Sequence, residues 1–307
     1  MLQHPRLTLP DPGPRNFATM VNALSVDVEE YFQAHAFERA IPRDAWERMP
    51  ARVVSNTRRV LRLLTDAGTR ATFFVLGWVA DHHPELVREI VAGGHELASH
   101  GYAHQLLYRQ NADDFRADLG RSLAAIRRAA GGTGEVLGYR APAFSLTDAS
   151  RWALDVLREH GLRYDSSVLP IPVRDRGSAL RGGKRYGLSG AGRFAARVHD
   201  GLWEFPVATL RFAGRIWPVA GGGYLRLYPL WLTRRAIRRI NAEGHPAVVY
   251  LHPWELDADE PDVPNTSRLA RLRHRVNVSR TESRLRALLA EGRWGPLREV
   301  FAAQLAS

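Results

Sequence analysis

Along the chain, short continuous apolar runs alternate with segments in which apolar residues recur every three or four positions. The first pattern predicts strands buried on both faces, and the second predicts amphipathic helices. The expected strands cover residues 22–28, 71–77, 96–98, 136–139, 203–207 and 247–251. The expected helices cover residues 52–66, 85–91, 113–130, 147–160, 230–241 and 282–291. The alternation of strand and helix predicts an α/β fold of parallel strands with helices outside them, in a distorted (β/α) barrel that is closed or incomplete.

Breaks in this pattern divide the chain into three parts. Residues 1–20 are rich in proline, which predicts an extended or disordered arm. Residues 21–260 are expected to form the α/β domain, and residues 261–307 a helical extension packed on that same domain. Residues 171–200 are rich in arginine and glycine and have little periodicity, so an irregular excursion or lid is expected there.

Composition narrows the possible chemistry. At 307 residues with 45% hydrophobic content, the chain can bury a full core. It contains no cysteine, so any metal must be bound by nitrogen and oxygen ligands. No apolar run is long enough to span a membrane, and residues 1–20 lack the apolar segment of a signal peptide. The expected location is therefore the cytoplasm, with export together with a partner left open.

The net charge of +11 is carried almost entirely by arginine, since Lys184 is the only lysine. Such a surface could attract nucleic acid, anionic lipid or an acidic polysaccharide. The arginines are scattered through helical patterns, however, and no RNA-binding aromatic motif or zinc finger accompanies them. Nucleic acid is therefore not an expected partner.

Ionisable residues follow several of the expected strands, and the carboxyl ends of parallel strands meet at one rim. His100 and His104 are four residues apart and can aim both imidazoles at one point, which is a metal-ligand spacing. A catalytic metal site needs a third protein ligand, for which a carboxylate is expected. The ionisable residues expected at the rim are Asp27, Glu29, His100, His104, Arg140, Asp165 and His252.

These residues lie in motifs that resemble those of the NodB-homology polysaccharide deacetylases, carbohydrate esterase family 4. The resemblance extends from about residue 22 to about residue 255, and the motifs follow the family order. They are Ser25-Val26-Asp27-Val28-Glu29, Ser99-His100-Gly101-Tyr102-Ala103-His104, Arg140-Ala141-Pro142 and Leu251-His252-Pro253. The Val-Asp-Val-Glu-Glu-Tyr-Phe opening and the His-Pro-Trp-Glu segment look most like deacetylases encoded with exopolysaccharide and exosortase systems.

The resemblance implies a role for each motif. Asp27 would be the catalytic base and Arg140 its ion-pair partner. His252 would be the general acid, and Asp165 would orient it. A divalent ion, expected to be Zn²⁺ with Co²⁺ or Ni²⁺ as alternatives, would be held by a carboxylate, His100 and His104.

The carboxylate ligand is the point at which this sequence departs from the family. The usual adjacent pair of aspartates is here Asp27-Val28-Glu29, so the ligand is Glu29 or Glu30. Residues i and i+2 of a strand point the same way, which favours Glu29.

Substrate contacts are expected from the backbone N–H of Ala143, which would hold the oxyanion, and from aromatic side chains that could stack on sugar rings. The candidates for stacking are Trp254, Tyr224 and Trp217. Gly221-Gly222-Gly223 lacks the spacing and the lysine of a P-loop and is expected to be a turn near the site.

The implied function is removal of acetyl groups from N-acetylated sugars of a bacterial polysaccharide, in exopolysaccharide biosynthesis. Loss of the second aspartate motivates one alternative, a metal-free amidase of the same fold that acts on a small cyclic amide or ureide. The basic surface motivates another, a non-catalytic binder of acidic polysaccharide. The sequence does not indicate the oligomeric state.

Overall fold

The computed structural model describes residues 20–171, 187–219, 221–263, 266 and 268–307. The expected arm at residues 1–20 therefore falls almost wholly outside the described residues, as does much of the expected excursion at residues 171–200. Within the described chain, no helix combines the length and the apolar character needed to cross a membrane.

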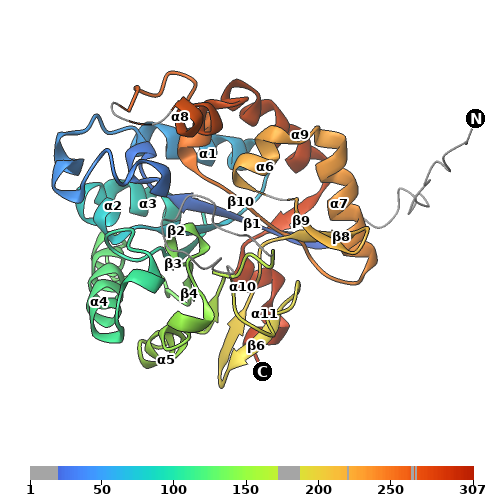
Figure 1. Cartoon of the computed structure of the whole chain (residues 1–307), viewed down its shortest axis with the longest axis horizontal. Helices are drawn as coiled ribbons and strands as arrows, with labels where there is room; N and C mark the ends of the chain where they lie inside the picture. Colours follow the sequence, from blue (N-terminus) through green and yellow to red (C-terminus); the bar gives the residue numbers. More distant parts are fainter. Residues whose placement is uncertain (1–19, 172–186, 220, 264–265, 267) are drawn as a thin grey trace, which may run out of the picture.

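One curled sheet forms the centre of the molecule (Figure 1). Its strands follow the order β10-β1-β2-β3-β4-β5-β7-β6, and β11 also pairs with β1. The strands are β1 (Val21–Val28), β2 (Thr72–Val75), β3 (Glu96–Ser99), β4 (Gly138–Tyr139), β5 (Tyr164–Asp165), β6 (Ala196–His199), β7 (Leu202–Glu204), β10 (Val248–Leu251) and β11 (Arg293–Gly295). All pairings are parallel except that of β6 with β7. Because β10 and β6 do not pair with each other, the barrel is incomplete, which confirms the expected fold class.

Strand β1 pairs with three other strands of this sheet. On one side it pairs in parallel with β10, and on the other it pairs with β2 along Ser25–Val28 and with β11 along Val21–Ala23. Its residues from Asn22 to Val28 are buried, because the strand is covered on both faces. The C-terminal extension was expected to be helical, but its strand β11 is part of the sheet.

The helices lie outside the sheet (Figure 1). In the longer helices the apolar residues recur at the spacing of one helical face, and that face is buried. The helices are α1 (Val53–Asp66), α2 (Gly77–His82), α3 (Pro84–Ala92), α4 (Ala112–Ala129), α5 (Ala153–Glu159), α6 (Gly222–Leu227), α7 (Leu230–Ala242), α8 (Arg268–Arg275), α9 (Thr281–Glu291), α10 (Leu297–Val300) and α11 (Ala302–Leu305).

Two local expectations differ from the structure, and one element was not expected. Strand β2 covers only residues 72–75 of the apolar run at 71–77, and α2 begins at Gly77. An added Cβ at Gly77 would lie 2.6 Å from the Tyr102 ring and 2.7 Å from Ser122 Cα, so this close approach requires glycine. The helix expected at 147–160 is broken into a 3₁₀ turn and the shorter α5. The hairpin of β8 (Thr209–Phe212) and β9 (Arg215–Pro218) was not predicted, and it forms a separate sheet of its own.

Candidate metal and catalytic site

The carboxyl ends of β1 and β3 bring three metal-ligating side chains together. Glu29 Oε2 lies 2.9 Å from His104 Nε2 and 3.8 Å from His100 Nε2. The three potential ligand atoms all lie within 4.8 Å of one another, and all three side chains are buried. The structure therefore assembles the triad expected from the sequence.

Each member of this triad is held by a neighbour. His100 Nδ1 lies 2.8 Å from the carbonyl oxygen of Arg140. Since a carbonyl only accepts, Nδ1 carries the proton and the Nε2 lone pair faces Glu29. Trp254 Nε1 donates to Glu29 Oε1 at 3.2 Å, which leaves Oε2 for the histidines. His104 adopts a left-handed φ of 50°, and Arg43 donates to its carbonyl oxygen at 3.3 Å.

The protonation states suit a divalent cation. Burial raises the pKa of Glu29, but His104, His252 and His100 outweigh it and hold that pKa well below its usual range. Burial lowers the pKa of His100 to about 4. Glu29 Oε2 is also buried without a hydrogen bond of normal geometry, although His104 Nε2 is close. A carboxylate with an unsatisfied oxygen and a neutral imidazole are the forms that bind metal, so the donor set fits Zn²⁺ or a similar ion.

Glu30 points to a different part of the structure. Its Oε1 accepts hydrogen bonds from the backbone N–H groups of Arg52 and Val53 at 2.8 and 3.0 Å, at the start of α1. Burial raises the pKa of Glu30 to about 7. Of the two glutamates left open by the sequence, the structure therefore brings Glu29 to the histidines.

Asp27 is clamped by a buried arginine. Arg140 Nη1 donates to Asp27 Oδ1 at 2.6 Å and to Ser25 Oγ at 2.8 Å. Its Nη2 donates to Ser166 Oγ at 2.8 Å, and its guanidinium lies 4.1 Å from the centre of the Phe74 ring. These contacts fix the direction of the Asp27 carboxylate and leave Oδ2 as its second oxygen.

His252 faces Asp27 and Glu29 from the end of β10. Its Nε2 lies 3.9 Å from Asp27 Oδ2 and 3.7 Å from Glu29 Oε1, and 18% of its side chain is accessible. Burial lowers the pKa of His252, but the hydrogen bond to Glu255 and the charges of Glu29, Glu255 and Asp27 raise it to about 9. The imidazole is therefore protonated near neutral pH and can act as an acid.

The carboxylate that orients His252 is Glu255, and the expectation for Asp165 is corrected. Glu255 Oε1 lies 2.7 Å from His252 Nδ1, because the 3₁₀ turn Pro253–Leu256 carries this carboxylate back over the histidine. Asp165 instead accepts a short hydrogen bond from Ser167 and lies opposite Glu204 in the pairing of β5 with β7. Burial and the adjacent Asp165 raise the pKa of Glu204 well above its usual range, so these two acids share a buried site of their own.

Parts of the chain match known protein families, and its fold matches a solved structure. Residues 45–164 match the family model described as "Polysaccharide deacetylase", and residues 166–302 match one described as "Domain of unknown function (DUF3473)". A candidate polysaccharide deacetylase from Mycobacterium smegmatis shares the fold with a TM-score of 0.61 at 23% identity, over 99% of this chain and 94% of that one. The first match supports the polysaccharide deacetylase family for residues 45–164, and the Mycobacterium smegmatis structure shows a shared fold.

Curated deacetylases match a shorter part of the chain. A chitooligosaccharide deacetylase from Bradyrhizobium sp. is 40% identical over 73 residues, which is 24% of this chain and 33% of the relative. A peptidoglycan-N-acetylglucosamine deacetylase from Bacillus cereus is 33% identical over 75 residues, which is 24% of this chain and 27% of the relative. The matched part of the chain thus spans about a third or less of the length of these deacetylases.

The structure treats the expected substrate contacts differently from one another. Trp254 is 6% exposed and its ring stacks between His252 and His274, at centroid distances of 4.8 and 4.0 Å. It therefore has no free face for a sugar, and its expected stacking role is corrected. Ala143 has a left-handed φ of 50°. Its role in holding the oxyanion stays a prediction.

The other two aromatic candidates lie on different elements. Tyr224 lies on α6, half-buried, with its ring 5.8 Å from that of Tyr228, so its stacking role also stays a prediction. Gly221, three residues before Tyr224, packs so closely on Tyr250 that an added Cβ would lie 2.1 Å from its ring. Tyr250 lies in β10 two residues before His252, so this turn lies near the site. Trp217 lies on the separate hairpin, in β9.

Two residues beside His252 were missed by sequence reasoning. Glu255 follows His252 by three residues, the spacing of a capping box, and that signal could have identified it. Arg226 donates to Glu255 Oε2 at 2.8 Å and to the carbonyl oxygen of His274. It lies 29 residues before Glu255, so nothing local in the sequence indicates the contact.

Proposed function

We propose that this protein is a metal-dependent hydrolase that removes acetyl groups from N-acetylated sugars of a bacterial polysaccharide. The observation that carries the proposal is one buried cluster in which Glu29, His100 and His104 lie beside the Asp27–Arg140 pair and His252. This cluster would supply a metal-ligand set, a base and an acid, which are the groups that hydrolysis of an amide requires.

Glu29, His100 and His104 would hold the ion. When bound, a divalent ion would polarise the acetamide carbonyl and lower the pKa of a water molecule. Asp27 Oδ2 would take a proton from the attacking water, because Oδ1 is occupied by Arg140. His252 Nε2 would donate its proton to the sugar nitrogen as the C–N bond breaks, so that acetate and a free amine leave. Glu255 would keep the other imidazole nitrogen protonated.

The substrate class rests on resemblance. The relatives named above are chitooligosaccharide and peptidoglycan-N-acetylglucosamine deacetylases, which favours an N-acetylated amino sugar here as well. The opening motif around Asp27 and the His-Pro-Trp-Glu segment favour a bacterial exopolysaccharide as the polymer.

The decisive experiment measures metal content and acetate release on the same purified samples, with chitooligosaccharides as substrate. We expect about one divalent ion per chain in the wild type, with metal and activity both lost in His100→Ala/His104→Ala. In Asp27→Asn we expect metal to be retained and activity to be lost. His82→Ala/His83→Ala removes two histidines of α2 and its C-terminal end and serves as the matched control.

Two other outcomes would replace the proposal. Activity on a small cyclic amide in protein that holds no metal would indicate the metal-free amidase. Binding of an acidic polysaccharide without acetate release from any acetylated glycan would indicate the non-catalytic binder.

A further inference from the structure

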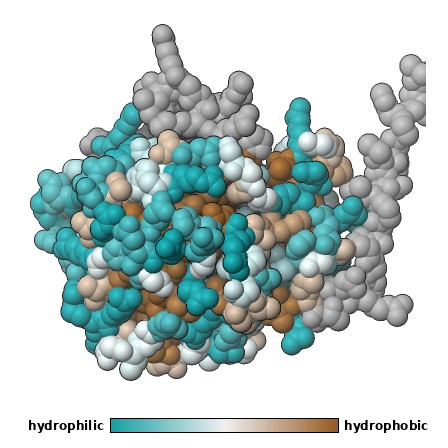
Figure 2. All heavy atoms as spheres, turned by 90° about the horizontal axis from the view of Figure 1, so that it is seen from below, coloured by the Kyte–Doolittle hydropathy of each residue, from teal (hydrophilic) through white to brown (hydrophobic). Residues whose placement is uncertain are grey.

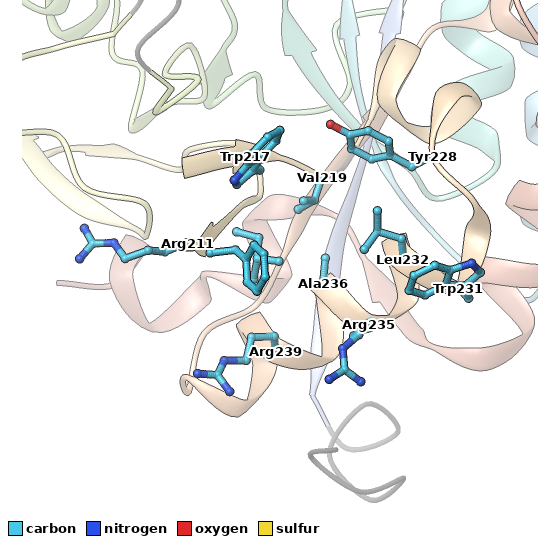
Figure 3. A pocket seen from close by; sticks show the side chains of 11 residues that line it. Arg211, Trp217, Val219, Tyr228, Trp231, Leu232, Arg235, Ala236 and Arg239 are labelled. Carbon is cyan, nitrogen blue, oxygen red and sulfur yellow. The ribbon is translucent and has the colours of Figure 1, made fainter. Parts of the chain in front are cut away.

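A groove of about 480 Å³ lies between the β8–β9 hairpin and helix α7 (Figure 3). Aromatic side chains from both elements line it, among them Phe212 and Trp217 from the hairpin and Trp231 from α7. These residues lie on elements that carry none of the catalytic or metal-ligating groups described above.

The groove gathers exposed apolar side chains. Phe212, Trp217 and Trp231 are 42%, 44% and 63% exposed, and Leu227 beside the lining residue Tyr228 is 52% exposed. In the part of the chain that the structure describes, Leu272 is the only other large hydrophobic residue exposed to this degree. On the face shown in Figure 2, hydrophilic residues surround smaller hydrophobic areas. A concentration of exposed aromatic residues in one groove is typical of an interaction site.

The hairpin places Phe212 and Trp217 on one of its faces. Its two-residue turn at Ala213 and Gly214 has φ values of 50° and 73°, which suit the twist of a tight hairpin. In its register Leu210 lies opposite Trp217, and Phe212 lies opposite Arg215. Opposed residues share one face of a hairpin, so one face carries two aromatic rings and an arginine.

The rim of the groove is cationic. Helix α7 contains four arginines, Arg234, Arg235, Arg238 and Arg239, and no acidic residue, although Arg234 pairs with Glu291 and Arg239 lies 3.8 Å from Glu243. Arg211, Arg235 and Arg239 line the groove itself. An apolar floor with an arginine rim complements a partner that has an apolar body beneath anionic groups.

The apolar floor and the arginine rim favour some binding partners over others. A second copy of this chain would bring one arginine rim against another, at a cost in like-charge repulsion. A neutral polysaccharide could stack on the aromatic rings but would leave the arginine rim without an anionic partner. The surface of a bilayer with anionic lipids offers acyl chains below a layer of phosphates, which matches both parts of the groove.

We propose that this groove docks the protein on membranes that contain anionic phospholipid. Phe212, Trp217 and Trp231 enter the interfacial layer, where aromatic rings are favoured, and the arginines contact lipid phosphates. The proposal does not depend on the deacetylase reaction, because none of these residues belongs to the site around His252.

The test is co-sedimentation of the full chain with vesicles of phosphatidylcholine alone or mixed with phosphatidylglycerol. We expect binding to the mixed vesicles that weakens with salt, and little binding to phosphatidylcholine alone. Phe212→Ala/Trp231→Ala should lower the partition coefficient by about tenfold or more. Arg211→Gln/Arg239→Gln should lower it by about fivefold for each arginine removed.

Matched controls use exposed residues elsewhere. Leu272→Ala removes an exposed apolar side chain from α8, and Arg127→Gln removes an exposed arginine from α4, and both should bind as the wild type does. Acetate release from soluble chitooligosaccharides and the thermal midpoint show whether each variant is folded, so a failed deacetylase assay in every sample would not affect this result. Equal binding by wild type and groove variants would overturn the proposal. Absence of vesicle binding, together with a dimer in sedimentation that Trp231→Ala dissociates, would assign the groove to a second copy instead.

Discussion

Glu255 Oε1 lies 2.7 Å from His252 Nδ1, and the same carboxylate accepts from Arg226 through its other oxygen at 2.8 Å. Glu255 and Arg226 are fully buried or nearly so, whereas His252 is partly accessible. The hydrogen bond to Glu255 fixes the Nδ1 edge of the imidazole, so that Nε2 faces Asp27. The buried ion pair therefore positions the proposed acid at the edge of the site.

Glu255→Gln keeps a hydrogen-bond acceptor near His252 but removes the charge. The pKa of His252, raised to about 9 in the wild type, should fall toward its usual 6.5. We expect the alkaline limb of the kcat/KM profile to move to lower pH and kcat to fall by roughly 10- to 100-fold. Because the folded-state pKa is raised, the stabilisation by this ion pair is complete below pH 6.5 and is lost as the pH rises through about 9.

Asp165→Asn is the matched control for that profile. Asp165 contacts Ser167 and Glu204 instead of His252, so this variant should leave the alkaline limb in place even if it lowers stability. A shift of the limb in Asp165→Asn and not in Glu255→Gln would contradict the assignment.

Glu29 and Glu30 are adjacent and buried, yet only Glu29 lies with His100 and His104. Glu29→Gln should abolish tight metal binding, because a neutral amide replaces the carboxylate ligand. Glu30→Gln should retain the metal and instead lower the free energy of unfolding by about 1 kcal/mol, since Glu30 caps the start of α1. Metal analysis and urea unfolding on both variants separate the two roles, and loss of metal in Glu30→Gln alone would reverse the assignment.

Trp254 donates its indole N–H to Glu29 Oε1 at 3.2 Å. Trp254→Phe keeps an aromatic ring in the stack between His252 and His274 but removes this donor. Groups that orient a ligand contribute to metal affinity, so we expect zinc to bind about 10- to 100-fold more weakly in competition with a chelating dye. Trp231→Phe, a surface tryptophan, should bind zinc as the wild type does. Unchanged zinc affinity in Trp254→Phe would show that the indole N–H is not needed.

His95 makes the fold sensitive to acid. It is 6% exposed, its Nδ1 accepts from Ala71 N–H at 3.2 Å, and burial lowers its pKa to about 4. Because the folded-state pKa is depressed, its stabilising effect is complete above pH 6.5 and is lost as the pH falls through about 4. Over that interval we expect a loss of about 2 kcal/mol, allowing for partial screening by solvent. Urea unfolding should show a smaller acid loss in His95→Gln, and equal losses in both proteins would contradict this account.

The sequence by itself determined most of the elements and narrowed the candidate metal ligands to His100, His104 and one of two glutamates. Helices α1, α3, α4, α7 and α9 follow from apolar periodicity within one or two residues, because each helix buries a single face and that face is visible locally. Asp27, His100, His104 and the Glu29/Glu30 pair stand out because they follow apolar strands, since parallel strands bring those ends to one rim. The choice of Glu29 over Glu30 came from the structure.

Only the tertiary structure decided which carboxylate contacts His252 and which residue Trp254 contacts. Asp165 and Glu255 both lie near strand ends, and the choice between them depends on how the turn after β10 folds and on Arg226, which comes from another element. The pairing of β11 with β1 and the groove beside α7 likewise join segments that are distant along the chain. Such contacts arise from packing between elements, and packing leaves no periodic signal in the sequence.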